Sequence, residues 1–116
     1  MLGAIRGIAL SGLDAARTRL SVSAHNVSNM NTEGFKAGIS QDVEQPGGRG
    51  VRPEVSTRQR PGPTITGDDG RRHTLSNTDV ADEAGQMILA RNAYRANLQA
   101  LKVADRMEEE AIHWVG

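Results

Sequence analysis

Three histidines are the side chains of this chain best suited to acid–base or metal chemistry. His25, His73 and His113 are far apart in the sequence, and their spacing fits no metal-binding motif. The chain has no cysteine, so thiol catalysis, thiolate metal ligands and disulfides are excluded. We therefore predict no metal and no cofactor.

Other catalytic signatures are also missing. The glycines between residues 67 and 70 precede Arg71, Arg72 and His73 and do not open a helix, as a phosphate-binding loop would. No nucleophile elbow is present, and the run Glu108–Glu110 is typical of a solvated helix face. The sequence predicts neither an enzyme nor a small-molecule substrate.

Arginines in the middle of the chain raise a second hypothesis, nucleic-acid binding. The same stretch, residues 31–77, carries six acidic residues, and no stacking aromatic accompanies the arginines. Over the whole chain, 14 basic residues balance 14 acidic ones. We therefore predict no nucleic-acid partner. The arginines concerned are Arg49, Arg52, Arg58, Arg60, Arg71 and Arg72.

The longest predicted elements lie at the two ends of the chain. In residues 1–30, small and apolar side chains recur every three or four residues, which predicts a helix that ends near Asn29–Gly34. Its stripe alternates alanine with larger residues, which suits close approach of a second helix. The stripe consists of Ile5, Ala9, Leu13, Ala16, Leu20, Ala24 and Val27.

A second helix is predicted from about residue 78. Residues 76–79 offer several N-cap side chains, and Asp82 and Glu83 place negative charge at the positive end of the helix dipole. Helical spacing then continues without a proline to the end of the chain, about 35 residues or roughly 50 Å. A helix of that length extends beyond a small globular fold, so we expect part of it to contact a neighbouring molecule.

The central segment has a different character. Residues 31–77 contain all four prolines and eight of the 13 glycines, which prevents a long regular element. Two pieces, 35–43 and 51–57, are candidate strands of a short hairpin, whereas 59–73 is expected to be a series of turns or a flexible segment. The predicted units are therefore an N-terminal helix (1–32), a loop-rich insert (33–77) and a C-terminal helix (78–116).

The predicted fold class is mainly α: two long terminal helices form an antiparallel, coiled-coil-like pair joined by a short loop or β-hairpin insert. The N-terminal 30 residues carry a net charge of +2 and residues 78–116 one of −3, which favours their pairing. With only three aromatic residues the core is aliphatic and thin, so burial must be completed by partners. For Tyr94, an intersubunit contact and an ordinary core position remain equally open, and for Trp114 a partner contact is favoured over a frayed end.

Both ends also carry motifs that resemble a known family. Gly12-Leu13-Asp14-Ala15-Ala16 and the run from Ala24-His25-Asn26-Val27-Ser28-Asn29 to Thr32-Glu33-Gly34-Phe35-Lys36 resemble the N-terminal signature of flagellar rod, hook and hook-associated axial proteins. Ser76-Asn77-Thr78-Asp79, Ala90-Arg91-Asn92-Ala93-Tyr94-Arg95-Ala96-Asn97 and Ala104-Asp105-Arg106-Met107 resemble the C-terminal signature.

This resemblance implies a structural role. Because the insert is short, the chain is most similar to small proximal rod proteins, self-assembling subunits of the drive shaft that links motor and hook. The implied partners are copies of the chain, other flagellar rod proteins and the flagellar export apparatus. The implied location is the periplasmic rod of the basal body, reached by type III export without a cleaved signal peptide. The alternatives are a non-polymerising helical adaptor and another axial component, such as a hook-associated protein.

The resemblance and the helix stripes together assign candidate site residues. For helix–helix and intersubunit packing they are Ile5, Leu13, Leu20, Val27, Val80, Met87, Tyr94, Leu98, Leu101, Met107 and Ile112. For a connector that sets how the first helix leaves its layer they are Asn26, Asn29, Thr32, Gly34, Phe35 and Lys36, although an Asn- and Gly-rich helix end would look the same without the family match. For the C-terminal motif they are Ser76, Asn77, Tyr94, Asn97 and Asp105.

Overall fold

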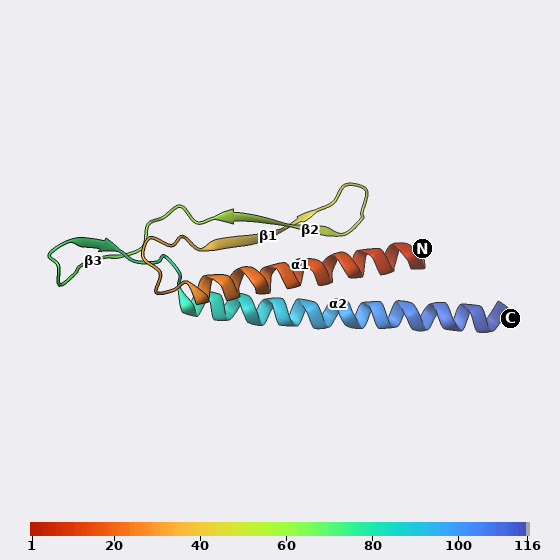
Figure 1. Ribbon diagram of the computed structural model, residues 1–116. Helices are drawn as coiled ribbons and strands as arrows, with labels where there is room; N and C mark the ends of the chain where they lie inside the picture. Colours follow the sequence, from red (N-terminus) through yellow and green to blue (C-terminus); the bar gives the residue numbers. More distant parts are fainter. Residues whose placement is uncertain (116) are drawn as a thin grey trace.

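The computed structural model describes residues 1–115 as an elongated molecule of 78 × 24 × 14 Å (Figure 1). Two long helices lie side by side and run in opposite directions, and two small antiparallel hairpins connect them. The predicted fold class is confirmed: a mainly helical chain in which the terminal helices pair and a short insert carries the strands.

Helix α1 spans Leu2–Ser28 and helix α2 spans Val80–Val115. The start of α2 is capped by Asp79, whose carboxylate accepts hydrogen bonds from the backbone N–H groups of Ala81 (3.0 Å) and Asp82 (3.4 Å). α2 has 36 residues against 27 in α1, and its last turns extend beyond the start of α1 (Figure 1).

The first hairpin lies along α1 (Figure 1). Strand β1 (Gly38–Glu44) pairs with β2 (Val51–Thr57), with Gly38 opposite Thr57 and Glu44 opposite Val51. Its turn closes on the helix at Gly50, where an added Cβ would lie 2.1 Å from the Ser11 hydroxyl oxygen. That hydroxyl accepts a hydrogen bond from the backbone N–H of Val51 (3.1 Å). Glycine is therefore required at the point where the turn meets α1.

A second hairpin corrects the expectation that residues 59–73 form only turns or a flexible segment. Strand β3 (Thr64–Thr66) pairs with β4 (Arg72–Thr74), and the hairpin lies beyond the connected ends of the helices (Figure 1). It is anchored by backbone hydrogen bonds from Gly34 N–H to Thr74 C=O (2.8 Å) and from Leu75 N–H to Pro63 C=O (2.7 Å). These long-range bonds satisfy backbone groups that local sequence patterns do not reveal.

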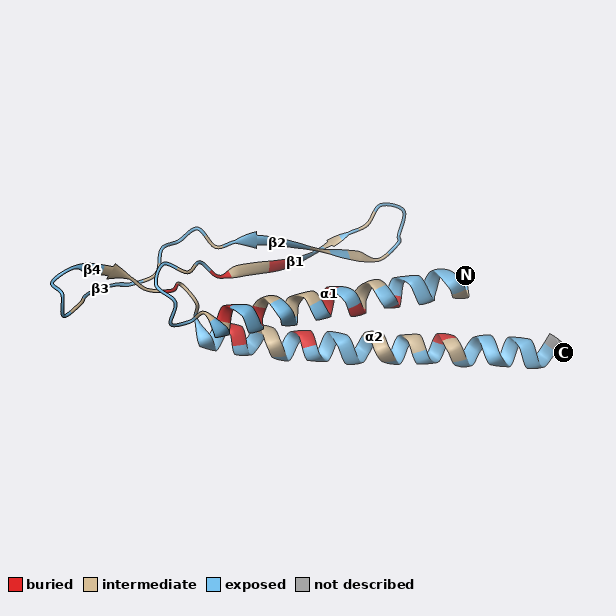
Figure 2. Ribbon diagram, in the orientation of Figure 1, coloured by how far each residue is buried: buried red, intermediate tan, exposed pale blue. Residues whose placement is uncertain are grey.

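The core is a narrow seam made mostly of alanine. Buried residues line the sides of α1 and α2 that face each other, whereas residues 106–114 at the end of α2 are all exposed (Figure 2). Alanine brings helices close together but buries little apolar area per residue, so hydrophobic stabilisation of the single chain is small. The buried apolar residues are Ala9, Leu13, Ala15, Ala16, Ala37, Ala90 and Ala104.

Candidate assembly surface and helix junction

Asn26 is the central residue of the junction where α1 ends, β1 begins and α2 begins. Its side chain is buried, with 1% exposure. The amide oxygen accepts a hydrogen bond from Gly38 N–H (2.8 Å), and the amide nitrogen donates to Gly38 C=O (2.9 Å) and to the Glu83 carboxylate (3.0 Å). The Asn26 side chain therefore satisfies both backbone groups of Gly38, as a neighbouring strand would, and links α1 to α2 through Glu83.

Asn77 has the corresponding role on the other side of the junction. Its amide oxygen accepts a hydrogen bond from Ala37 N–H (2.5 Å), and its amide nitrogen donates to the carbonyls of Arg58 (3.1 Å) and Arg60 (2.6 Å). Its own N–H donates to Phe35 C=O (3.1 Å). This asparagine therefore holds the chain leaving α1, the end of β2 and the start of α2 at fixed relative positions.

Glu83 lies in the first turn of α2, as predicted, and is also a site residue whose buried contact was not predicted. It was assigned only to the charged first turn of α2, yet its side chain is buried, with 3% exposure, against the Asn26 amide. The signal was present, because Glu83 lies four residues before Met87 and so occupies a position of the apolar stripe. A carboxylate there requires a buried hydrogen-bond donor from the facing helix.

The remaining connector residues form the turn after α1. Asn29 donates from its side-chain amide to the carbonyl of His25 (3.0 Å) and accepts from the Thr32 hydroxyl (3.0 Å). Gly34 has φ of +73°, which reverses the chain, and Phe35 packs edge-to-face on His25 with ring centroids 5.6 Å apart. Lys36 is exposed. His25 therefore has a packing role in the turn.

Gly12 and Asn97, which belong to the N-terminal and C-terminal motifs, pack tightly against each other across the helix seam. A Cβ added at Gly12 would lie 2.2 Å from the side-chain oxygen of Asn97. The Asn97 amide donates to the Ala93 carbonyl of its own helix (2.8 Å), which holds the side chain in this position. The two terminal motifs thus meet in space and set the helix separation.

Charged and polar side chains tie the helices at the edges of the seam. Near the start of α1, Arg6 pairs with Asp105 of the C-terminal motif and with Glu108 (3.0 Å). Further along, Arg19 donates to Gln86 (2.9 Å) and lies 3.4 Å from the Asp42 carboxylate of β1. At the junction, Ser76 is buried and its hydroxyl accepts from Thr78 N–H (3.1 Å). The pairing is thus both apolar and electrostatic.

The residues expected in packing fall into two groups in the single chain. Those buried or half-buried in the seam are Leu13, Val27, Met87, Leu98 and Leu101. Those that remain exposed although the helices are paired are Ile5, Leu20, Val80, Tyr94, Met107 and Ile112. The second group is therefore available to contact other molecules.

One cluster of titratable side chains lies outside the helices. His73 of β4 is held between Asp69 (3.1 Å) and Glu33 (2.8 Å). Hydrogen bonds to these two carboxylates raise the pKa of His73 above its usual 6.5. A hydrogen bond from the backbone N–H of Arg71 lowers the pKa of Asp69, and the hydrogen bond with the His73 side chain lowers it further. The cluster tethers the second hairpin to the connector.

Within residues 1–115, no group of three or more potential ligands comes together to hold a metal ion. In the same part of the chain, neither helix is both long enough and apolar enough to cross a membrane. An elongated helix pair with a narrow seam and exposed apolar rows is the architecture of a structural protein that packs against neighbours.

Comparison with known families identifies the chain. Residues 8–36 match the family model described as flagella basal body rod protein, and residues 74–113 match the model described as flagellar basal body rod FlgEFG protein C-terminal. A comparison with individual curated proteins found no match. The two family matches cover more than half of the chain and include most of both helices and the turn after α1, so the protein belongs to the flagellar basal body rod family of axial proteins.

Membership of this family settles the general class. The family is structural and not enzymatic, which confirms the prediction that the chain is not an enzyme. It also places the chain among proteins of the flagellar axial structure that assemble with one another. The matched segments contain Asn26, Asn77, Glu83 and the Gly12–Asn97 contact, so the junction and the seam lie in the part of the chain that the family models describe.

Proposed function

We propose that this chain is a subunit of the proximal flagellar rod, which assembles through its terminal helices into the drive shaft between motor and hook. The observation that carries the proposal is the row of large apolar side chains left exposed on two helices that are already paired. Ile112 is 66% exposed and Met107 is 49% exposed, so about half or more of each of these apolar residues faces solvent. Contact with neighbouring subunits would cover such rows.

The small size of the insert supports a rod position. The segment between the helices consists of two hairpins, and the larger of them lies on α1 and adds no separate domain (Figure 1). A slender molecule of this kind fits a shaft in which subunits pack side by side. We propose residues 1–32 and 78–116 as the axial helical unit and 33–77 as the insert that contacts adjacent layers.

We further propose that the chain is exported through the flagellar channel with its N-terminal region uncleaved. Two observations support this route. The chain belongs to the rod family, and its N-terminal segment forms the helix that we propose takes part in assembly. Mass spectrometry of the chain recovered from basal bodies should find its N-terminal residues intact. Recovery of a chain shortened within α1 would contradict this route.

The test of rod function is the composition of purified basal bodies. Cells that carry a tagged copy should yield basal bodies that contain the chain, and deletion of its gene should abolish both the rod and swimming. A stable monomer over a wide concentration range in light scattering, with the chain absent from basal bodies, would instead show a non-polymerising adaptor.

A surface substitution separates assembly from folding. Met107→Asp places a charge in an exposed row and should stop rod incorporation while leaving export and helix content unchanged. Val55→Asp, on the exposed part of β2, is the matched control and should swim normally. Normal swimming of the Met107 variant would show that this row of α2 is not an assembly contact.

A further inference from the structure

A hollow opens between α1 and α2 about halfway along the pair. Its floor is formed by the buried Ala16 and Ala90, and its rim by Leu20 and Tyr94, which are 45% and 37% exposed. The floor and rim are therefore apolar, and much of each of the two large rim residues is exposed to solvent.

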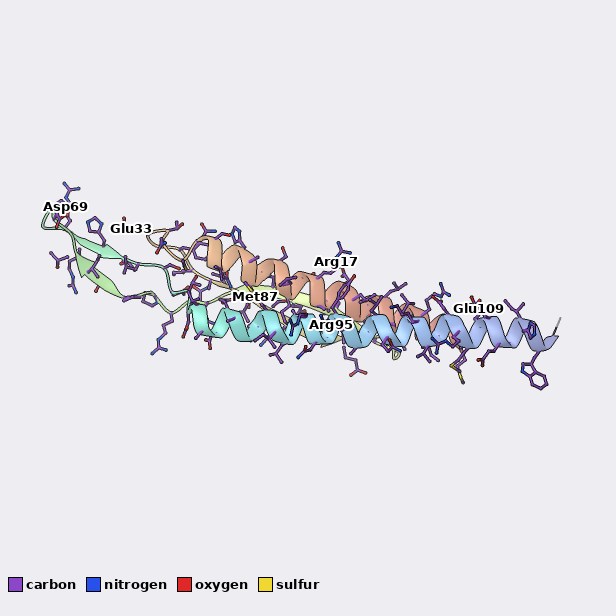
Figure 3. All side chains as sticks on the ribbon, turned by 90° about the horizontal axis from the view of Figure 1, so that it is seen from below. Arg17, Glu33, Asp69, Met87, Arg95 and Glu109 are labelled. Carbon is purple, nitrogen blue, oxygen red and sulfur yellow. The ribbon has the colours of Figure 1, made fainter. Side chains whose placement is uncertain are left out.

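Three arginines surround this hollow. Arg17 comes from α1, and Arg91 and Arg95 come from α2; Figure 3 shows Arg17 and Arg95 on the two adjacent helices. All three are exposed, and none forms an ion pair with a carboxylate in residues 1–115. An apolar hollow with three unpaired positive charges fits a ligand that is apolar at its centre and acidic at its edge.

The end of α2 has the complementary chemistry. Arg6, near the start of α1, forms ion pairs with Asp105 and Glu108 of α2. Beyond that level come Glu109 and Glu110, and then Ile112 and Trp114, which are 66% and 89% exposed. Figure 3 shows Glu109 on the part of α2 that extends past α1. The overhang, residues 109–114, thus combines two free carboxylates with the most exposed aromatic residue of the chain.

We propose that the overhang of one copy docks into the arginine-lined hollow of the next copy. Glu110 and Trp114 lie one turn apart on the same face of the overhang, so Glu110, with Glu109 at its edge, then faces the arginines while Trp114 covers Leu20 and Tyr94. This inference rests on the proposed rod function and specifies one contact by which copies of the chain join.

The two halves of the contact lie far apart on one molecule. Twenty residues separate Tyr94 from Trp114, so the helix places them about 30 Å apart along its axis. Two copies with the same polarity are therefore staggered by about 30 Å, and the joined pair still presents one free hollow at one end and one free overhang at the other. A contact of this heterologous kind does not close and propagates into a filament.

Cross-linking in isolated basal bodies tests the contact, since the chain has no cysteine of its own. Ser21→Cys next to the hollow and His113→Cys in the overhang are both at exposed positions. Within one chain these positions are about 35 Å apart along the helix pair, beyond the reach of a short bismaleimide. The double variant should give a ladder of dimers, trimers and larger species.

Matched controls show whether the ladder requires both cysteines at these two positions. Either single-cysteine variant should give no ladder, and Ser56→Cys with His113→Cys should give none, because Ser56 is exposed on β2 and does not line the hollow. Covalent dimers without larger species would overturn the staggered arrangement in favour of a closed pair.

Charge reversal tests the chemistry of the contact. Arg91→Glu with Arg95→Glu should lower the yield of the ladder at least tenfold, and adding Glu109→Arg with Glu110→Arg should restore it. Reversing two other exposed arginines, Arg49 and Arg72, changes the net charge equally and should leave the ladder intact. An unchanged ladder in the first variant, or no rescue in the combined one, would overturn the proposal.

The results also separate this contact from the proposed function. Basal bodies that contain the chain but give no ladder would refute the docking of the overhang and leave the rod function standing. Basal bodies that lack the chain would refute the rod function and, with it, this contact.

Discussion

Replacing Asn26 by alanine should destabilise the fold more than any other single truncation of a polar side chain. The substitution removes three hydrogen bonds and leaves Gly38 N–H, Gly38 C=O and the buried Glu83 carboxylate without this partner. Two neutral bonds at roughly 1 kcal/mol each and one charge-assisted bond at roughly 1.5–3 kcal/mol give a loss of about 3–5 kcal/mol.

A loss of this size is a large part of the stability of a small domain, about 5–15 kcal/mol. Urea unfolding followed by circular dichroism should therefore show a clearly lower midpoint for Asn26→Ala, with the urea dependence of the unfolding free energy unchanged. Asn31→Ala, at an exposed position of the same connector, is the control and should change stability by less than about 0.5 kcal/mol.

The partner of Asn26 provides a stricter test. Asn26→Ala leaves the buried Glu83 carboxylate unpaired, and Glu83→Ala removes that carboxylate. The double variant should therefore be more stable than the sum of the two single losses predicts. A coupling of about 1–3 kcal/mol is expected between two residues in direct contact. Strict additivity, or a loss below about 1 kcal/mol for Asn26→Ala alone, would refute the junction as described.

Two further predictions concern the seam and the second hairpin. Gly12→Ala should destabilise the helix pair by about 1–3 kcal/mol in thermal unfolding, because its Cβ would overlap the Asn97 side chain, and Asn97→Ala in the same chain should recover most of the loss; no recovery would place the strain elsewhere. The ion pairs of His73 should stabilise the second hairpin most between pH 3.8 and 6.5. Because the pKa of His73 is raised in the folded state, the stabilisation from His73 is lost as pH rises through that folded pKa. Because the pKa of Asp69 is lowered in the folded state, the stabilisation from Asp69 is lost as pH falls below 3.8 through that folded pKa. Amide exchange of β4 measured against pH should show this window, and a His73 that titrates at or below 6.5 would contradict it.

The helices were predictable because their determinants are local. A stripe repeated every three or four residues and an aspartate placed before it are enough to specify a long helix and its start, and Asp79 caps α2 as such a residue should. The first hairpin was also foreseen, since its strands flank a turn with several positive-φ glycines, among them Gly47 and Gly48. In each case the information lies within a few residues of the element.

The second hairpin and the junction depend on contacts between distant parts of the chain. Strands of three residues carry almost no periodic signal, and Gly34 and Thr74, which anchor them, are far apart in the sequence. The same holds for Asn26, a predicted connector residue whose amide bonds to Gly38 of β1 and to Glu83 of α2. Sequence patterns identified these side chains as important without showing what they contact.

The asymmetric burial of the two helices explains why the chain should require neighbours. α1 lies between the first hairpin and α2, so it is covered on two sides, whereas α2 contacts α1 along a single seam (Figures 1 and 2). Within residues 80–114, the buried residues of α2 are Ala90, Ala104 and the polar Glu83, which together remove little apolar area from water. The large apolar side chains of α2 lie mainly on its uncovered sides, so most of the hydrophobic free energy that this helix can contribute is released only when other subunits cover it.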